Sequence, residues 1–138
     1  MIRAVIDTNV VLASQRSNHP TSPNVEIVAR WMAGGFDWLH TPDIIEEYTE
    51  KLLKLGVPNA KTTRLLALLQ VGGIQVEIAF FHLRHYPADA DDTVFLLAAL
   101  NGNASHLVTY DGHLQDVGVS YPEFVTCEPV EFLQALRP

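Results

Sequence analysis

Apolar residues recur along the chain in two patterns, and each pattern predicts one kind of secondary structure. Short apolar runs that end in polar residues, or alternate with them, are typical of strands. They predict strands over residues 2–6, 36–40, 74–78, 107–109 and 124–127. Apolar residues at helical spacing, bounded by capping residues, proline or glycine, predict helices over residues 23–32, 42–55, 60–70, 93–100 and 129–136. Residues 10–13 could begin another helix, and loops are predicted over residues 14–23 and 79–88.

Strands thus alternate with helices, which is typical of a parallel sheet covered on both faces. The predicted fold is α/β, with three layers (α/β/α) around a central parallel sheet. A chain of 138 residues has the size of one hydrophobic core, so a single domain over residues 1–138 is expected. In such sheets ligands bind beyond the carboxyl ends of the strands, near the point where the strand order reverses.

Two aspartates stand where predicted strands end. Asp7 directly follows the run Val5-Ile6, and Asp111 lies just beyond residues 107–109, with Gly112 predicted to permit a turn. Either aspartate alone has an ordinary explanation, because polar residues commonly terminate strands. In a parallel sheet, however, both would lie at the same edge.

The helix predicted over residues 42–55 directs one of its glutamates toward the body of the protein. At 100° per residue, one apolar stripe of this helix contains Ile44, Ile45, Tyr48, Leu52 and Leu55. Glu47 borders this stripe, whereas Glu46 and Glu50 point nearly opposite to it. The ordinary alternative is that Glu47 is solvated and pairs with Lys51 four residues on, which would contribute only a few tenths of a kcal/mol.

A further acid precedes the helix predicted over residues 93–100. Asp92 shares a helical face with apolar residues at i+3, i+4 and i+7, namely Phe95, Leu96 and Ala99. This spacing puts Asp92 on the inward face of the first turn, while Asp89 and Asp91 need not lie there. An acid in a first turn can also serve only to complement the helix dipole.

Together, these four acids suggest chemistry that none of them suggests alone. Carboxylates gathered over one crevice repel each other and raise each other's pKa unless a cation lies among them. Oxygen ligands favour Mg²⁺ or Mn²⁺, and no cysteine or histidine set with zinc spacing occurs. Such a cation can activate a water and stabilise a departing oxygen, which is the chemistry of phosphodiester hydrolysis.

The net charge of -7 argues against general binding to polyanions, although a metal site would account for part of it. Four of the nine basic residues fall in one stretch, Lys51, Lys54, Lys61 and Arg64. They could face phosphates, or they could be the solvated outer faces of two helices. No apolar run approaches the roughly 20 residues that a membrane helix needs, and the early Asp7 does not suit a signal peptide. A cytoplasmic protein with no membrane partner is expected.

Four successive segments resemble the motifs of the PIN domain, and they extend over nearly the whole chain. The segments are residues 5–11 (VIDTNVV), 41–48 (TPDIIEEY), 92–95 (DTVF) with Ala99, and 107–111 (LVTYD). No single motif is specific to this family, but four motifs in this order and at these separations form a strong combined signal. The chain resembles more narrowly the bacterial toxin components of toxin–antitoxin systems that are related to VapC toxins.

The resemblance implies a metal-dependent endoribonuclease acting on RNA, with Asp7, Glu47, Asp92 and Asp111 as the acidic catalytic and metal-binding residues. It further implies that Asn9 and Thr109 orient these acids and that Thr8 could help. Glu46 competes with Glu47 for the second position, and the helical wheel and Tyr48 favour Glu47. Asp89 and Asp91 compete with Asp92 for the third, where Asp92 has the right distance to Phe95 and Ala99, and Asp89 could assist.

The chain departs from the family pattern at two positions. Thr41 replaces a serine and keeps a hydroxyl cap. Tyr110 stands where relatives often have glycine, so it could narrow the substrate entrance, alter the presentation of Asp111, or stack on a base. The resemblance also implies a homodimer and possibly a small antitoxin partner. The main alternative is a catalytically weak PIN-like module that serves in protein interaction.

Overall fold

The computed structural model describes residues 1–137 and contains one parallel sheet in the order β3-β2-β1-β4-β5. The strands are β1 (Arg3–Ile6), β2 (Asp37–His40), β3 (Ile74–Gln75), β4 (His106–Val108) and β5 (Val125–Cys127). The helices are α1 (Thr8–Arg16), α2 (Pro23–Met32), α3 (Pro42–Lys54), α4 (Asn59–Gly72), α5 (Thr93–Asn101), α6 (Gly112–Gly118) and α7 (Pro129–Leu136), with the 3₁₀ turn η1 (Ala90–Asp92) before α5.

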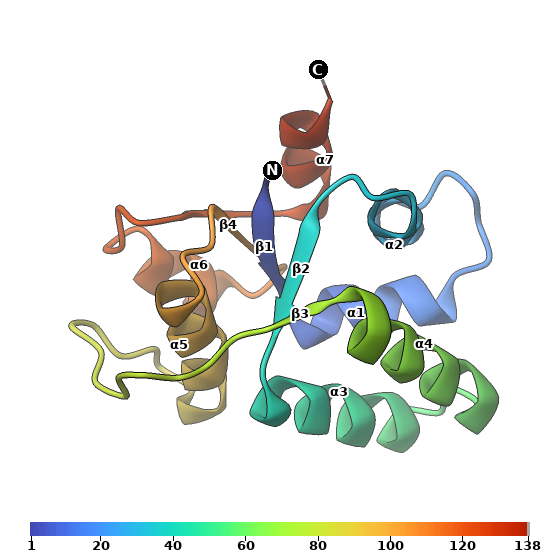
Figure 1. Cartoon of the computed structure of the whole chain (residues 1–138), viewed down its shortest axis with the longest axis horizontal. Coiled ribbons are helices and arrows are strands. Elements are labelled where there is room, and N and C mark those ends of the chain that lie inside the picture. Colours follow the sequence, from blue (N-terminus) through green and yellow to red (C-terminus); the bar gives the residue numbers. More distant parts are fainter. Residues whose placement is uncertain (138) are drawn as a thin grey trace.

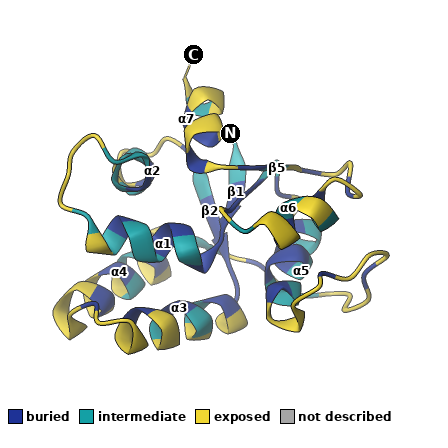
Figure 2. Ribbon diagram, turned by 180° about the vertical axis from the view of Figure 1, so that it is seen from behind, coloured by how far each residue is buried: buried dark blue, intermediate teal, exposed yellow. Residues whose placement is uncertain are grey.

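The helices lie on both sides of the sheet. Helices α5 and α6 are on one side of the strands, and α1 to α4 are on the other (Figures 1 and 2). Helix α5 packs on β1, β2 and β4, while α2 packs on α1 and α7. The predicted three-layer α/β fold with a parallel sheet is therefore confirmed.

The strand order reverses at β1, the central strand. From β1 the chain continues to β2 on one side, and it returns later to β4 on the other. The connections therefore diverge at the carboxyl ends of β1 and β4. In parallel sheets this is the position where a crevice forms.

The core explains why the strands read as apolar runs. Val5, Ile6, Leu39, Leu107 and Val108 are fully buried, because helices cover both faces of the sheet (Figure 2).

Polar contacts fix α3 against the end of β1. The hydroxyl of Tyr48 donates a hydrogen bond to the carbonyl of Ile6 and accepts one from the Trp38 indole at 3.3 Å. Both rings are completely buried. These contacts determine the position of the residues next to Tyr48, including Glu47.

Several predicted boundaries were wrong. The segment predicted as a loop over residues 14–23 is helical as far as Arg16, and Ser14 does not end the helix, since its hydroxyl is satisfied by the Val11 carbonyl at 2.6 Å. The turn predicted at Gly112 opens α6, whose Leu114 is buried in the core. At the edge of the sheet β3 has only two residues, although the Val76 amide still donates to the His40 carbonyl at 2.8 Å.

Two details of the predicted helix faces also differ. Leu55 was included in the apolar stripe of the helix over residues 42–55, but it follows the last turn of α3 and is 42% exposed. Asp92 belongs to η1, the tight turn that precedes α5, so it lies just before the first turn of α5. Between residues 1 and 137 no helix has the length and apolarity needed to cross a membrane.

Candidate functional site

A cavity of about 250 Å³ opens at the carboxyl ends of β1 and β4, and it contains all four predicted acids. We call it the acidic crevice; it is lined by Asp7, Thr8, Asn9, Leu12, Glu47, Lys51, Leu55, Asp89, Asp91, Asp92 and Asp111. The acids come from four separate parts of the chain. The sheet topology brings these parts together, as the strand ends predicted for Asp7 and Asp111 and the helix faces for Glu47 and Asp92.

Asp7 is the most constrained of the four. Its side chain is 5% exposed and caps α1, accepting a hydrogen bond from the Thr8 amide at 2.7 Å. Its second oxygen accepts one from the Thr109 hydroxyl at 2.6 Å. Burial, and then the charges of Glu47 and Asp111, raise the pKa of Asp7 to about 6 against these two hydrogen bonds.

Asp92 has a buried oxygen that no partner satisfies. The residue is 8% exposed, and its Oδ2 atom has no hydrogen-bond partner among the described residues. Burial, and then the charges of Asp7, Asp111, Asp89 and Glu47, raise its pKa to about 7. Leaving a buried carboxylate oxygen unpaired is costly, so this atom suits a ligand.

Glu47 projects into the crevice from α3, as its place beside the apolar stripe predicted. It is half-buried and accepts a hydrogen bond from the Thr8 hydroxyl. Burial raises the pKa of Glu47 despite this hydrogen bond and the nearby charge of Lys51. Glu46 lines a neighbouring hollow instead, so the geometry distinguishes the two glutamates as the wheel did.

Asp111 has two roles at the N-terminus of α6. Its Oδ1 atom accepts hydrogen bonds from the amides of His113 at 2.8 Å and Leu114 at 3.4 Å, which caps the helix. Its own amide donates to the Thr109 hydroxyl at 2.9 Å. Thr109, fully buried, therefore connects Asp7 to Asp111, which suits the orienting role expected of it.

Asn9 lines the crevice, and its side-chain oxygen is 3.5 Å from the amide of Tyr110, which lies outside the residues that line the crevice. Tyr110 is 41% exposed and donates its hydroxyl to the Asn24 side chain at 3.0 Å. The tyrosine is thus tethered to α2 beside Asp111. The pattern of residues along the chain contained no signal for Asn24, which is 86 positions away from Tyr110.

The competing aspartates of the third motif all reach the crevice. Asp89 caps η1 by accepting from the Asp91 amide at 2.9 Å, and both residues are exposed. Only Asp92 is buried with a free oxygen. Of the predicted basic residues, Lys51 lines the crevice, whereas Lys54, Lys61 and Arg64 lie outside it.

The side chains of the acidic crevice have the chemistry that a hard divalent cation requires. It consists of carboxylate oxygens, which Mg²⁺ and Mn²⁺ prefer, and Asp92 adds a buried oxygen that lacks a partner. No three acidic, histidine or cysteine side chains among residues 1–137 are grouped tightly enough to hold an ion as they stand. Mutual repulsion of ionised carboxylates favours such a spread arrangement.

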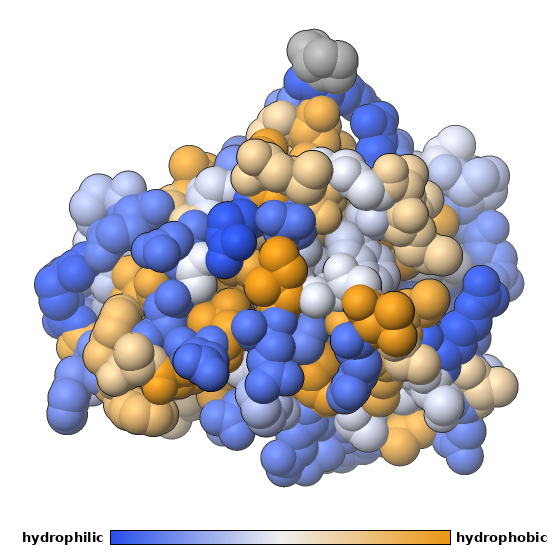
Figure 3. Space-filling view, viewed as in Figure 1, coloured by the Kyte–Doolittle hydropathy of each residue, from blue (hydrophilic) through white to orange (hydrophobic). Residues whose placement is uncertain are grey.

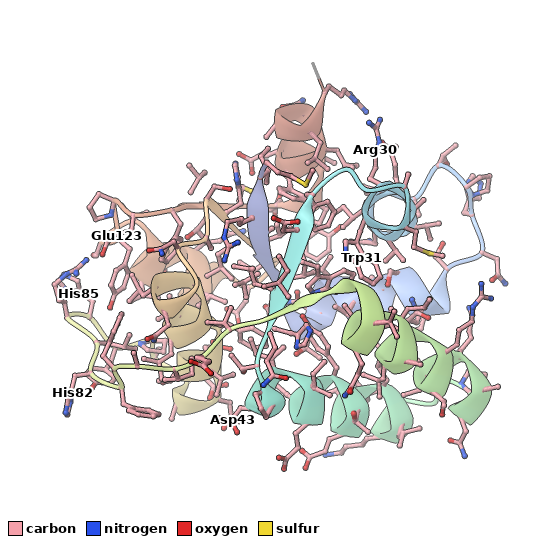
Figure 4. The ribbon with its side chains drawn as sticks, in the orientation of Figure 1. Arg30, Trp31, Asp43, His82, His85 and Glu123 are labelled. Atoms are coloured by element: carbon pink, nitrogen blue, oxygen red, sulfur yellow. The ribbon has the colours of Figure 1, made fainter. Side chains whose placement is uncertain are left out.

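A larger hollow of about 360 Å³ lies elsewhere and lacks this chemistry. It is formed by Phe80, His82, Arg84 and the end of α5, and its one acid, Glu123, accepts two hydrogen bonds from Arg84 at 2.9 and 2.7 Å. Glu123, His82 and His85 lie across α5 from helices α3 and α4 (Figure 4). The histidines therefore take no part in the acidic crevice.

The fold and the site define an α/β protein with an acidic, all-oxygen crevice at the switch point of a parallel sheet. The chain belongs to the PIN domain family, whose model matches residues 3–113. A chain from the crystal structure of VapBC2 from Rickettsia felis bound to a DNA fragment from their promoter is similar in fold, with a TM-score of 0.60 and 11% identity over 92% of this chain and 98% of that one. Among curated proteins, no sequence matches this chain.

Proposed function

We propose that this protein is a metal-dependent endoribonuclease that hydrolyses RNA phosphodiester bonds. The observation that carries the proposal is the convergence of Asp7, Glu47, Asp92 and Asp111 on one crevice, where burial raises the pKa of the first three. Carboxylates arranged at such cost are typical of sites that bind a cation or perform acid–base chemistry. Membership of the PIN domain family supports the same function.

In this proposal the four acids hold Mg²⁺ or Mn²⁺. The bound ion supplies a water of lowered pKa and a positive charge near the departing oxygen. Thr109 fixes the direction of the Asp7 carboxylate through its hydroxyl, and Thr8 does the same for Glu47. When a cation compensates the carboxylate charges, the two threonines would thereby keep the oxygens of Asp7 and Glu47 directed into the crevice.

Residues in and beside the crevice would position the substrate. Asn9 has side-chain polar atoms that line the crevice, and Asp89 could add an outer acid from η1. Tyr110, tethered by Asn24, presents an exposed ring beside Asp111 on which an unpaired base could stack. Single-stranded or looped RNA suits this site best, because stacking on a side chain requires an unpaired base.

The experiment is cleavage of labelled single-stranded and structured RNAs in Mg²⁺, in Mn²⁺ and in EDTA. Wild-type protein is compared with Asp7→Asn and Asp92→Asn, and with Asp116→Asn as an exposed aspartate of α6 outside the crevice. The proposal expects metal-dependent cutting that is lost in the first two variants and kept in the third. Equal behaviour of all four proteins would contradict it and favour the protein-interaction module.

The similarity in fold to a VapBC chain supports a more specific role as the toxin of a toxin–antitoxin pair, acting with a small antitoxin protein. The resemblance to VapC toxins further implies that the protein acts as a homodimer. Induced expression in a bacterial host is then expected to arrest growth. The Asp7→Asn variant, expressed to the same level, is expected not to. Growth arrest by both proteins would refute a toxic activity based on cleavage.

A further inference from the structure

The basic residues of this acidic protein are distributed unevenly. Arg30 and Arg137 form ion pairs with Glu26, Arg84 pairs with Glu123, and Arg3 donates to the Gly102 carbonyl. The five other cations are Arg16, Lys51, Lys54, Lys61 and Arg64, and within residues 1–137 none of them has a carboxylate at ion-pair distance. We call these five residues the cationic corner.

Contacts between three helices hold the cationic corner together. The Arg16 guanidinium, at the end of α1, donates to the Leu55 carbonyl just beyond α3. Lys61 in the first turns of α4 donates to the Gln15 carbonyl at 2.7 Å. Cations at helix C-terminal carbonyls are favourable in themselves, and these bonds leave the remaining N–H groups of both side chains available.

The cationic corner begins at the acidic crevice and extends away from it. Lys51 and Leu55 line the crevice, and Arg16 contacts Leu55. Lys61 and Arg64 line the next hollow, of about 210 Å³, together with Gln15. Positive charge therefore continues from Lys51, which lies near Glu47 in the crevice, across the ends of α1 and α3 to the start of α4.

A second hollow that adjoins the crevice is mostly acidic. Asp43, Glu46, Glu50 and Asp91 are all exposed and line a hollow of about 330 Å³, which shares Glu47, Lys51 and Asp91 with the crevice. Asp43 lies at the first turn of α3 (Figure 4), where hydrophilic side chains gather at the lower edge of the molecule (Figure 3). We call these four residues the acidic wall, and none of them forms an ion pair within the described part of the chain.

Helix α3 is thus polarised, with acids toward its start and Lys51 and Lys54 toward its end. This order also complements the helix dipole, which would account for a modest stabilisation of α3 alone. The dipole does not account for Arg16, Lys61 and Arg64, which come from two other helices. A single-stranded polyanion would be attracted by the cationic corner and repelled by the acidic wall.

We infer that RNA is bound on one side of the scissile phosphate only, along the cationic corner, while the acidic wall keeps the other side unbound. This inference rests on the proposed ribonuclease function. It adds Arg16 to the candidate RNA contacts and assigns a direction to the substrate path. It also explains how a protein with a net charge of -7 can bind a polyanion, because the charge on the path differs from the total.

The test is a charge-matched pair of triple variants. In the first, Arg16→Gln, Lys61→Gln and Arg64→Gln remove three cations that do not line the acidic crevice. In the control, Arg30→Gln, Arg84→Gln and Arg137→Gln remove the same charge from ion-paired positions elsewhere. Surface ion pairs contribute little to stability, so both proteins are expected to fold, which circular dichroism checks.

We call the first triple variant the corner variant. With a cleaved RNA and Mn²⁺, its KM is expected to be at least about tenfold higher than that of wild type, and its kcat to stay within about twofold. Its binding should depend less on salt, with the log–log slope reduced by about 2 because a single-stranded contact contributes about 0.7. The control variant should match wild type. Substrates shortened from the 5′ or the 3′ side of the cut should lose affinity for wild type on one side only, and this loss should vanish in the corner variant.

Two results would overturn the inference while leaving the ribonuclease function intact. The first is cleavage by the corner variant with the KM of the control. The second is an equal loss of affinity when either side of the cut is shortened. If wild type cleaved no RNA in any metal, the proposed function would fail, and the inference with it.

Discussion

Replacing Asp7 by asparagine is expected to stabilise the metal-free protein while abolishing its activity. The Asp7 carboxylate is 5% exposed, and burial raises its pKa from 3.8 to about 6. A difference of roughly 2 pKa units corresponds to about 3 kcal/mol against the ionised form in the folded state. Asparagine removes that charge and keeps one acceptor oxygen, at a loss of about 1 kcal/mol in hydrogen bonding. The net expected gain is about 2 kcal/mol at pH 8.

The sign of the pH dependence shows whether a change in stability comes from the buried charge of Asp7 or from another cause. Below pH 3.8 Asp7 is protonated in both the folded and the unfolded state and contributes nothing. Between pH 3.8 and about 6 the unfolded chain releases the proton first, so the stability of wild type falls as the pH rises. Above about pH 6 the full penalty applies. The advantage of Asp7→Asn should therefore be largest at pH 8 and should disappear toward pH 4.

The assay is urea denaturation in EDTA at several pH values between 4 and 8, with Asp116→Asn as the matched control. The exposed control is expected to stay within about 0.5 kcal/mol of wild type at every pH. If Asp7→Asn were less stable than wild type at pH 8, or if its advantage did not change with pH, the argument from a buried charge would be refuted.

Two other substitutions test the framework around the site. Thr109→Val removes the hydroxyl that donates to Asp7 and accepts from the Asp111 amide, so cleavage should fall by about 10- to 100-fold, with recovery in Thr109→Ser; a valine variant with full activity would show that the orienting bonds are dispensable. Tyr48→Phe deprives the Ile6 carbonyl of its donor and should lower the free energy of unfolding by about 1 to 3 kcal/mol in denaturant titrations, whereas an unchanged value would mean that this bond does not stabilise α3.

The strands and the acids could be predicted because their causes are local or follow from simple geometry. A strand covered on both faces must be apolar throughout, and parallel strands must end at one edge, which places Asp7 near Asp111. The helical period, together with Tyr48, separated Glu47 from Glu46. These features depend on neighbouring residues and on the fold class, and the pattern of residues along the chain indicates both.

The remaining features depend on contacts between distant positions. Arg16 reaches the Leu55 carbonyl 39 residues away, so its membership of the cationic corner could not be predicted from the stretch of lysines. Helix α6 is capped by Asp111, whereas the position of Asp111 after a strand and before Gly112 predicted only a turn there. Helix α1 extends to Arg16 although the composition of residues 14–23 favours a loop, and the Ser14 hydroxyl is satisfied within the helix by the Val11 carbonyl.

The central claim is that Asp7, Glu47, Asp92 and Asp111 together bind a divalent cation. Mn²⁺ binding, measured by electron paramagnetic resonance of the free ion at pH 7.5, tests it without requiring the correct RNA. Wild type and Asp116→Asn are expected to bind Mn²⁺ equally, and Asp92→Asn at least about tenfold more weakly, because the free Oδ2 oxygen is replaced by an amide group. Absence of binding by wild type, or equal binding by Asp92→Asn, would contradict the account.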